Sequence, residues 1–365
     1  TSLDEGEKMK AILMLEDGHS FNGEAFGQAG ESIGEVIFNT AVVGYQEMLT
    51  DPANAGKILV MTYPLIGNYG CAPKFNESKK IWVSGLVIKE KSRIFSNWQA
   101  KSSLDDFVKS EKLLSIQGID TRTLTVHLRN KGGALGIIST SEFEKKELLA
   151  KIEVFRKNKP KSWLPEISVS KPTRLGKVRG KRVAILDLGV TKSVIKQLES
   201  LGFSLTLFPY NTTAHEILKA KPKGLVISGG PEQDPGLKNI EENIRALVNK
   251  LPILAISAGF QVLASSLGAK VVKMKLGHRG VNYPIFAPTS YKGEVTCQNH
   301  SYSVDAASLN KIKNIKITAN NLNDRTVEEV ESKKMKIIAI QYNPSSPGFN
   351  EVNSVFKRFG KIMEE

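Results

Sequence analysis

The sequence Ile-Leu-Ala-Ile-Ser-Ala-Gly-Phe-Gln, which ends at Gln261, places a serine between a short apolar run and a helical pattern. This layout is typical of a nucleophile elbow, in which a sharp strand-to-helix turn exposes one reactive side chain. Here that side chain belongs to Ser257. Because backbone N–H groups at the start of the following helix favour a developing anion, the turn predicts a site for acyl-transfer chemistry.

A second turn, Ser228-Gly229-Gly230-Pro231, follows the preceding apolar run. Glycine allows the backbone to approach a ligand closely, so this turn can bring another N–H to the same site. A Gly-Gly-Pro turn alone more often just ends a strand. Because both turns follow successive strands, we expect them to meet at one edge of a sheet.

The part of the chain after residue 181 alternates short apolar runs with helical periodicity. This succession predicts a doubly wound, mostly parallel sheet covered by helices on both faces. The expected strands are 183–188, 204–208, 225–227 and 253–256, and the expected helices are 194–201, 213–220 and 240–251.

The N-terminal half reads as a β-rich mixed α/β domain with a few peripheral helices. The expected strands are 11–15, 20–26, 35–39, 57–62 and 83–88, and the expected helices are 105–110, 121–130 and 142–158. We find no metal cluster, phosphate loop or paired carboxylates here, and no ATP-binding motif anywhere in the chain. Any ATP chemistry must therefore come from a partner.

With 365 residues, 41% of them hydrophobic, the chain is long enough for two domains. We expect a first domain over residues 1–155, a linker over 156–180 and a second domain over 181–365. Between Arg156 and Arg182 the sequence contains ten Lys or Arg residues and one acidic residue, Glu166. This short segment therefore contributes +9 of the net charge of +14. Its prolines and glycines and its lack of periodicity favour an exposed basic linker, although such a segment could also contact an acidic partner.

Composition also excludes several classes of protein. No apolar stretch approaches 18 residues, and the acidic, polar first residues do not resemble a secretory signal. Two cysteines, Cys71 and Cys297, are too few for a disulfide framework, so we expect a reducing cytoplasm and no structural zinc. The basic charge is not interleaved with aromatic residues, and we expect no nucleic acid partner.

Several further motifs occur along most of the chain. They are Gly44-Tyr45-Gln46-Glu47, Leu49-Thr50-Asp51-Pro52, Ile66-Gly67-Asn68-Tyr69-Gly70, Gly118-Ile119-Asp120-Thr121-Arg122, Gly277-His278-Arg-Gly280, Gln298-Asn299-His300 and Gln341-Tyr-Asn343-Pro344, together with the elbow itself. These motifs resemble the carbamoyl phosphate synthase small subunit, whose C-terminal part is a class I glutamine amidotransferase domain. Those of the N-terminal half are narrow to this family.

The resemblance implies that a Cys, a His and a Glu hydrolyse glutamine, and that the ammonia passes to a large, ATP-using subunit. In this sequence those three positions carry Ser257, Asn343 and Ser345, so no catalytic residue is intact. The positions that resemble glutamine-contacting ones are Gly230, Gln261, Asn299, Ser301, Tyr302 and Ala53, of which Ala53 and Ser301 depart from the usual serine and glycine. Glu232 replaces a second glycine of the oxyanion turn, where a negative side chain is unwelcome unless it points away.

A serine hydroxyl needs an adjacent base, and an Asn at position 343 cannot accept and return a proton. Losing a nucleophile or base in a comparable triad costs about 10⁶-fold, roughly 8 kcal/mol of barrier. We therefore expect a pseudoenzyme: a structural or regulatory subunit in a cytoplasmic heteromeric complex of pyrimidine or arginine biosynthesis, without cofactor or metal. Two alternatives stay open: a hydrolase in which His300 activates Ser257, and a sensor that binds glutamine without cleaving it. For Cys297 we favour a packing role over a role as a displaced nucleophile.

Overall fold

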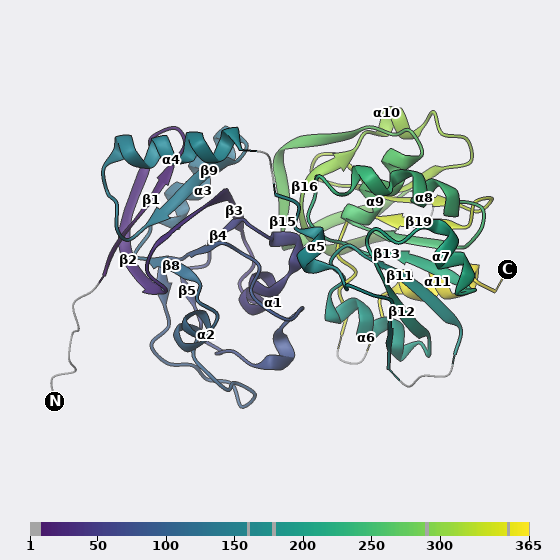
Figure 1. Cartoon of the computed structure of the whole chain (residues 1–365), viewed down its shortest axis with the longest axis horizontal. Coiled ribbons are helices and arrows are strands. Elements are labelled where there is room, and N and C mark those ends of the chain that lie inside the picture. The colour runs from purple at the N-terminus through teal and green to yellow at the C-terminus, as the bar shows by residue number, and fades with distance from the viewer. Residues whose placement is uncertain (1–8, 159–160, 177–179, 289–291, 349–350, 365) are drawn as a thin grey trace. The chain divides into compact units, whose positions relative to one another are not determined.

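The computed structural model describes residues 9–158, 161–176, 180–288, 292–348 and 351–364. The chain forms two compact units, residues 1–159 and residues 160–365. Each unit has its own hydrophobic core, so each is described by itself. Figure 1 shows the β-rich first unit and the second unit with its large sheet.

The N-terminal unit is built around a closed barrel with strand order β1-β2-β8-β6-β4-β3-β9, in which β9 pairs back onto β1. Alternate residues of β1 face opposite sides. Leu13 lies in the same core as Leu124 and Leu128 of α3, whereas Ile12 packs with Leu148 of α4. The elements are β1 (Lys10–Leu15), β2 (Ser20–Gly27), β3 (Glu31–Asn39), α1 (Tyr45–Thr50), η1 (Pro52–Asn54), β4 (Ile58–Met61), β5 (Leu65–Ile66), η2 (Pro73–Phe75), β6 (Gly85–Val87), β7 (Glu90–Lys91), α2 (Leu104–Ser110), β8 (Leu114–Gln117), α3 (Thr121–Lys131), β9 (Ala134–Ser139) and α4 (Lys145–Lys157).

Local sequence signals fix the ends of the N-terminal helices. Ser103 and Asp106 form a capping box at α2, and the Asp120 side chain accepts a hydrogen bond from the Thr123 amide at the start of α3. Gly132, at φ +84°, ends α3. The predicted β-rich mixed domain is confirmed, but the sequence reading did not include β8 and β9, which close the barrel.

The segment over residues 156–180 contains two short elements, α5 (Leu164–Ile167) and β10 (Thr173–Leu175). β10 pairs antiparallel with β12, and Leu164 is fully buried in a core of the second unit. The Asp234 carboxylate also accepts hydrogen bonds from the Ser162 hydroxyl and the Trp163 amide. This part of the chain therefore packs on the second unit through Leu164 and β10, whereas Lys161, Pro165 and Lys171 are exposed.

The C-terminal unit is built around a ten-stranded sheet with order β10-β12-β11-β13-β14-β19-β18-β17-β15-β16. The five strands from β12 to β19 in that order are parallel, and the remaining strands pair antiparallel. The elements are β11 (Arg182–Asp187), α6 (Lys192–Ser200), β12 (Ser204–Pro209), α7 (Ala214–Lys219), β13 (Gly224–Ile227), η3 (Lys238–Ile240), α8 (Glu241–Leu247), β14 (Ile253–Ile256), α9 (Ala258–Ser266), β15 (Val271–Ala287), β16 (Lys292–Val304), α10 (Ala306–Leu309), β17 (Lys316–Asn321), β18 (Val327–Ser332), β19 (Ile337–Ile340) and α11 (Ser354–Ile362).

Helices cover both faces of the parallel strands. On one face α7, α8 and α9 bury Ile217, Ile244 and Phe260, and on the other α6 and α11 bury Leu198 and Phe356. This arrangement confirms the predicted doubly wound α/β architecture. The long β15–β16 hairpin was not anticipated, because its residues alternate irregularly and its register shifts twice.

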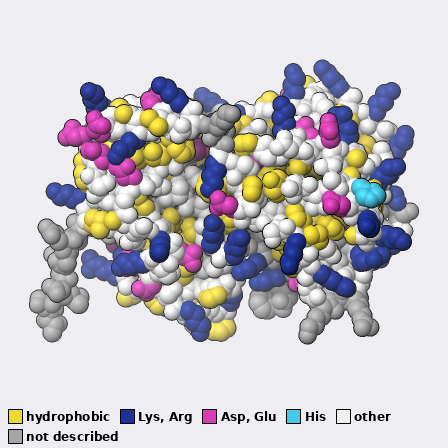
Figure 2. All heavy atoms as spheres, viewed as in Figure 1, with side chains coloured by type: hydrophobic (Ala, Val, Ile, Leu, Met, Phe, Trp, Pro, Cys, Tyr) yellow, Lys and Arg dark blue, Asp and Glu magenta, His cyan; other side chains and the backbone are white. Residues whose placement is uncertain are grey.

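Two further observations concern nucleic-acid binding and membrane spans, the classes that the sequence argues against. Figure 2 shows Lys and Arg side chains spread over the visible face rather than gathered in one patch. Within the described residues, no helix has the length and apolar character needed to cross a membrane.

Candidate functional site

Ser257 lies between β14 and α9, in the predicted strand-turn-helix arrangement. Its backbone has φ +51° and ψ −113°, a conformation that L-residues rarely adopt and that surrounding structure must hold in place. The Ser257 amide donates to the Ile340 carbonyl at 2.7 Å, and the Gln261 amide donates to the Ser257 carbonyl at 3.0 Å. The sharp turn of a nucleophile elbow is therefore present.

The glycine-rich turn after β13 lies beside this elbow, as the sequence predicts. A Cβ added to Gly229 would lie 3.8 Å from the Cβ of Ser257, and one added to Gly230 would lie 1.9 Å from the Leu188 carbonyl oxygen. Gly259, on the first turn of α9, comes equally close to the end of β13, because a Cβ there would lie 2.4 Å from the Ile227 carbonyl oxygen. Only glycine fits this approach of two backbones.

Asn343 and Ser345, which stand where the resemblance implies a His and a Glu, have side chains that do not act as bases. Asn343 is half-buried, and its amide donates to the Cys297 carbonyl at 2.9 Å. Ser345 is exposed, and its carbonyl accepts from the Asn353 side chain at 3.0 Å. Within the described residues, no side chain forms a hydrogen bond with the Ser257 hydroxyl.

His300, the imidazole considered as a replacement base, has both ring nitrogens engaged elsewhere. Its Nδ1 lies 2.9 Å from the Tyr302 carbonyl oxygen, and its Nε2 lies 2.7 Å from Oε1 of Gln298. The side chain is completely buried, and this burial lowers the pKa of His300 to about 4. No ring nitrogen remains to activate Ser257.

His300 belongs to a buried polar network that sequence reasoning missed. Gln298 also lies 2.9 Å from Nδ1 of His278, whose Nε2 lies 3.0 Å from Oδ2 of Asp324. Burial acts to lower the pKa of His278, but the hydrogen bond that the ring donates to Glu328 and the nearby carboxylate charges raise it overall. The motif Gln298-Asn299-His300 was the signal for this network, which ties β15, β16 and β18 together.

The Glu232 side chain contacts α9 and β16, the elements that carry three of the predicted ligand-binding residues. Its carboxylate accepts hydrogen bonds from the Ser301 amide at 2.6 Å, the Tyr302 amide at 3.1 Å and Nε2 of Gln261 at 2.7 Å. All three partners belong to the set of residues that resembles a glutamine-binding site. The sequence indicated a misplaced negative charge at position 232, but it did not indicate which atoms this charge contacts.

The other predicted ligand-binding residues are distributed over both units. Gly230 lies at the elbow, and Asn299 is half-buried on β16 between Gln298 and His300. Ala53 belongs to η1 of the N-terminal unit, where its amide donates to the Asp51 carboxylate at 2.9 Å. The structure thus groups Gly230, Gln261, Ser301 and Tyr302 around β13, α9 and β16.

Two groups of side chains have donor atoms close enough to hold a metal ion. One is the buried set His278, His300 and Glu328, and the other is Asp17, His19 and His127 in the N-terminal unit. Neither group contacts Ser257 within the described residues, so neither supplies a metal-bound nucleophile at the elbow.

Two family models match the chain, one to each unit. Residues 13–138 match the model described as the carbamoyl-phosphate synthase small chain, CPSase domain, and residues 184–361 match the model described as glutamine amidotransferase class-I. Together these matches cover most of both units.

Similar proteins are matched over almost their whole length. A carbamoyl phosphate synthase small chain of Syntrophotalea carbinolica is 38% identical over 98% of this chain and 98% of its own length. One of Listeria innocua is 40% identical over 97% of each chain. A pyrimidine-specific small chain of Bacillus subtilis is 36% identical over 98% of this chain and 96% of its own.

Proposed function

This chain belongs to the carbamoyl phosphate synthase small-chain family, and we propose that within it the chain acts as a subunit that does not hydrolyse glutamine. One observation carries the proposal: the elbow is built, but among the described residues no side chain forms a hydrogen bond with its hydroxyl. Asn343 and Ser345 stand where a base and its orienting carboxylate belong.

The chemistry of amide cleavage explains why this matters. A neutral serine hydroxyl attacks a carboxamide only when a base removes its proton and returns it to the leaving nitrogen. An amide and a hydroxyl do neither at neutral pH. A serviceable oxyanion turn at Gly229 and Gly230 leaves only the residual catalysis that such donors give by themselves.

The hydrogen bonds of Glu232 support the same proposal. The Glu232 carboxylate already occupies the amides of Ser301 and Tyr302 and the side chain of Gln261. A free amino acid that used these donors for its own carboxylate would have to displace a charge-assisted set of hydrogen bonds. We therefore propose that these donors are not available to glutamine, which also argues against a glutamine sensor.

What the chain retains is a scaffold. Similarity over 97–98% of its length to small chains supports a role in holding a partner, and the family implies the large, ATP-using subunit. We propose a structural or regulatory subunit of a cytoplasmic heteromeric complex that supplies carbamoyl phosphate for pyrimidine or arginine biosynthesis. The partner would then draw on free ammonia.

The first test is an ammonia-release assay with glutamine, run with the purified chain alone and with the large subunit. We expect no release above background in either case, and no labelling of Ser257 by a fluorophosphonate probe. Turnover that disappears in Ser257→Ala would overturn the proposal and would favour the hydrolase alternative. Co-purification with the large subunit tests the scaffold role separately.

The second test rebuilds the site. The triple variant Ser257→Cys, Asn343→His and Ser345→Glu introduces the reactive groups that the family implies. We expect it to remain inactive while Glu232 occupies the Gln261, Ser301 and Tyr302 donors. Adding Glu232→Gly should then give measurable glutaminase activity. Isothermal titration with glutamine provides the matched binding readout: a flat trace for the native chain and heat for Glu232→Gly. Heat with the native chain would instead favour the sensor.

A further inference from the structure

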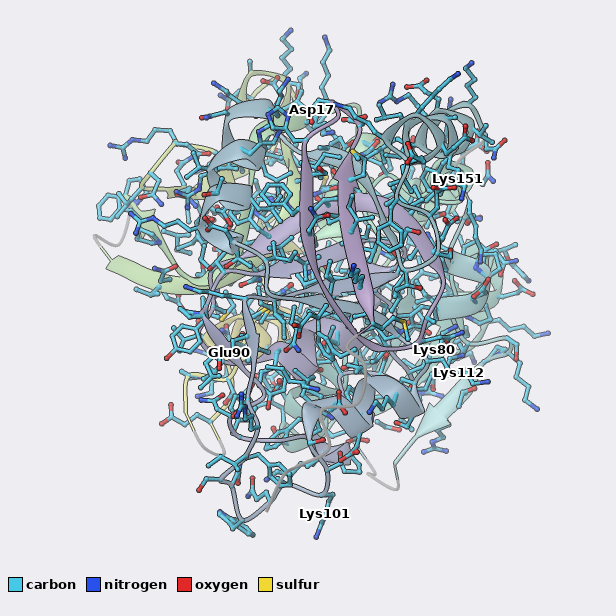
Figure 3. The ribbon with its side chains drawn as sticks, turned by 90° about the vertical axis from the view of Figure 1, so that its left-hand side faces the viewer. Asp17, Lys80, Glu90, Lys101, Lys112 and Lys151 are labelled. Carbon is cyan, nitrogen blue, oxygen red and sulfur yellow. The ribbon has the colours of Figure 1, made fainter. Side chains whose placement is uncertain are left out.

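Three donor-bearing side chains converge at the end of the β1–β2 hairpin. Asp17 lies in the turn, His19 follows two residues later, and His127 comes from α3, 108 residues further along the chain. Oδ2 of Asp17 lies 2.7 Å from Nε2 of His127, and Oδ1 lies 3.2 Å from Nδ1 of His19. The two imidazole centroids are 4.2 Å apart. Figure 3 shows Asp17 at the upper end of the barrel strands.

We propose that Asp17, His19 and His127 bind a divalent transition-metal ion, with Zn²⁺ the best match to their chemistry. Two imidazoles and one carboxylate form a donor set that zinc accepts, with water completing the shell. Donor atoms of a tetrahedral zinc site lie about 3.3 Å apart, given bonds of about 2.0–2.1 Å. The three donor atoms here lie within 4.8 Å of one another, so small side-chain rotations suffice.

The framework around these donors is fixed before any ion binds. Gly18, at φ +83°, and the hydrogen bond from the Leu15 amide to the His19 carbonyl shape the turn. α3 is anchored in the barrel core by Leu124 and Leu128. The site is accessible from solvent on one side, because the His19 side chain is 61% exposed whereas that of His127 is 17% exposed.

One charge at the cluster favours a bound cation and another opposes it. Burial acts to raise the pKa of Asp17, but hydrogen bonds from the His19 amide and the His127 ring lower it to about 2, so the carboxylate is ionised at neutral pH. Against this, the Lys131 ammonium lies 3.6 Å from Oδ2 of Asp17. A bound cation must therefore displace or repel Lys131, and removing that charge should strengthen binding.

The buried set His278, His300 and Glu328 is a weaker candidate. Both ring nitrogens of each histidine already face partners within the network, and Glu328 and His300 are completely buried. A cation entering there would have to break those contacts inside the protein. At the hairpin cluster a cation would replace the contacts of Asp17 with His19 and His127, but the exposed His19 leaves solvent access to the donors.

A metal at the hairpin would have a structural consequence. It would join the β1–β2 turn to α3, two elements far apart in the sequence, and so close a long loop of the barrel unit. A metal ion that binds only the native state would increase the free energy of unfolding of that unit. The inference does not depend on whether the chain hydrolyses glutamine, because the cluster lies in the other unit from Ser257.

The test is isothermal titration of Zn²⁺ into the tag-free, metal-stripped full chain. We expect one site, an affinity at least about 100-fold weaker in His19→Gln and in His127→Gln, and a tighter site in Lys131→Gln. His215→Gln, an exposed histidine of α7, is the matched control and should bind like the native chain.

Circular dichroism would verify that each variant folds. Because His19 is mostly exposed, its replacement leaves the core untouched and keeps the test meaningful even if His127→Gln is less stable. The proposal is overturned if the native chain takes up no zinc, or if the His19 and His127 variants bind it as tightly as His215→Gln.

Discussion

Replacing Ser257 with glycine tests whether the elbow stores backbone strain. Ser257 has φ +51° and ψ −113°, a region that costs an L-residue about 1–3 kcal/mol and that glycine adopts freely. Glycine loses about 0.5–1 kcal/mol through its more flexible unfolded chain. The difference predicts that Ser257→Gly stabilises the native state by about 1 kcal/mol.

Ser257→Ala is the control that isolates the backbone. Alanine keeps the Cβ and therefore the strain, while it removes a hydroxyl that has no side-chain hydrogen bond within the described residues. We expect its free energy of unfolding to stay within about 0.5 kcal/mol of the native value. For a unit of about 200 residues, the gain in the glycine variant corresponds to about 2–4 °C in Tm.

Calorimetry and urea unfolding at the same pH provide the two readouts. A second control, Lys336→Gly, relieves another positive φ, +53°, in a turn far along the chain from the elbow. If Ser257→Gly is less stable than Ser257→Ala, the turn is not strained in the way the dihedral angles imply. The strain argument would then be refuted.

Two further predictions concern the same unit. Gly230→Ala should destabilise the chain by about 2–4 kcal/mol in urea, because its Cβ would lie 1.9 Å from the Leu188 carbonyl oxygen; a loss below about 0.5 kcal/mol would contradict the close approach of these backbones. Burial lowers the pKa of His300 to about 4, below its unfolded value of about 6.5, so the stability that its neutral form contributes is present above pH 6.5 and lost as pH falls toward 4. This loss amounts to about 3 kcal/mol, and His300→Gln should flatten the fall in unfolding free energy over that window; an equally steep fall in the variant would contradict it.

Much of the fold could be predicted because its signals are local. Apolar runs located β11, β12, β13 and β14, and the Ser-Ala-Gly turn located the elbow to the residue. The adjacency of the two turns followed from the edge at which parallel strands end. β8 and β9 were missed because their pairing joins residues far apart in sequence, and no local pattern specifies that register. The β15–β16 hairpin was missed because its residues alternate irregularly and its register shifts twice.

The candidate site, like the fold, has features that the sequence specifies and features that only the tertiary structure decides. Which residue types occupy positions 257, 343 and 345 is read directly from the sequence, whereas the direction of the Glu232 side chain depends on where Ser301 and Tyr302 fold, about 70 residues later. The convergence of Asp17 with His127 is likewise set by the packing of α3 on the barrel. Sequence patterns identify candidate chemistry, and the tertiary structure decides which groups meet.

The Glu232 carboxylate has a consequence for how the proposed function could change. Because its oxygens are bonded to Gln261, Ser301 and Tyr302, a thiol placed at the elbow by a single substitution would, on the proposed function, bring no glutaminase activity while this acid remains. Under that proposal, activity would depend on several substitutions acting together, so one side chain makes it hard to gain.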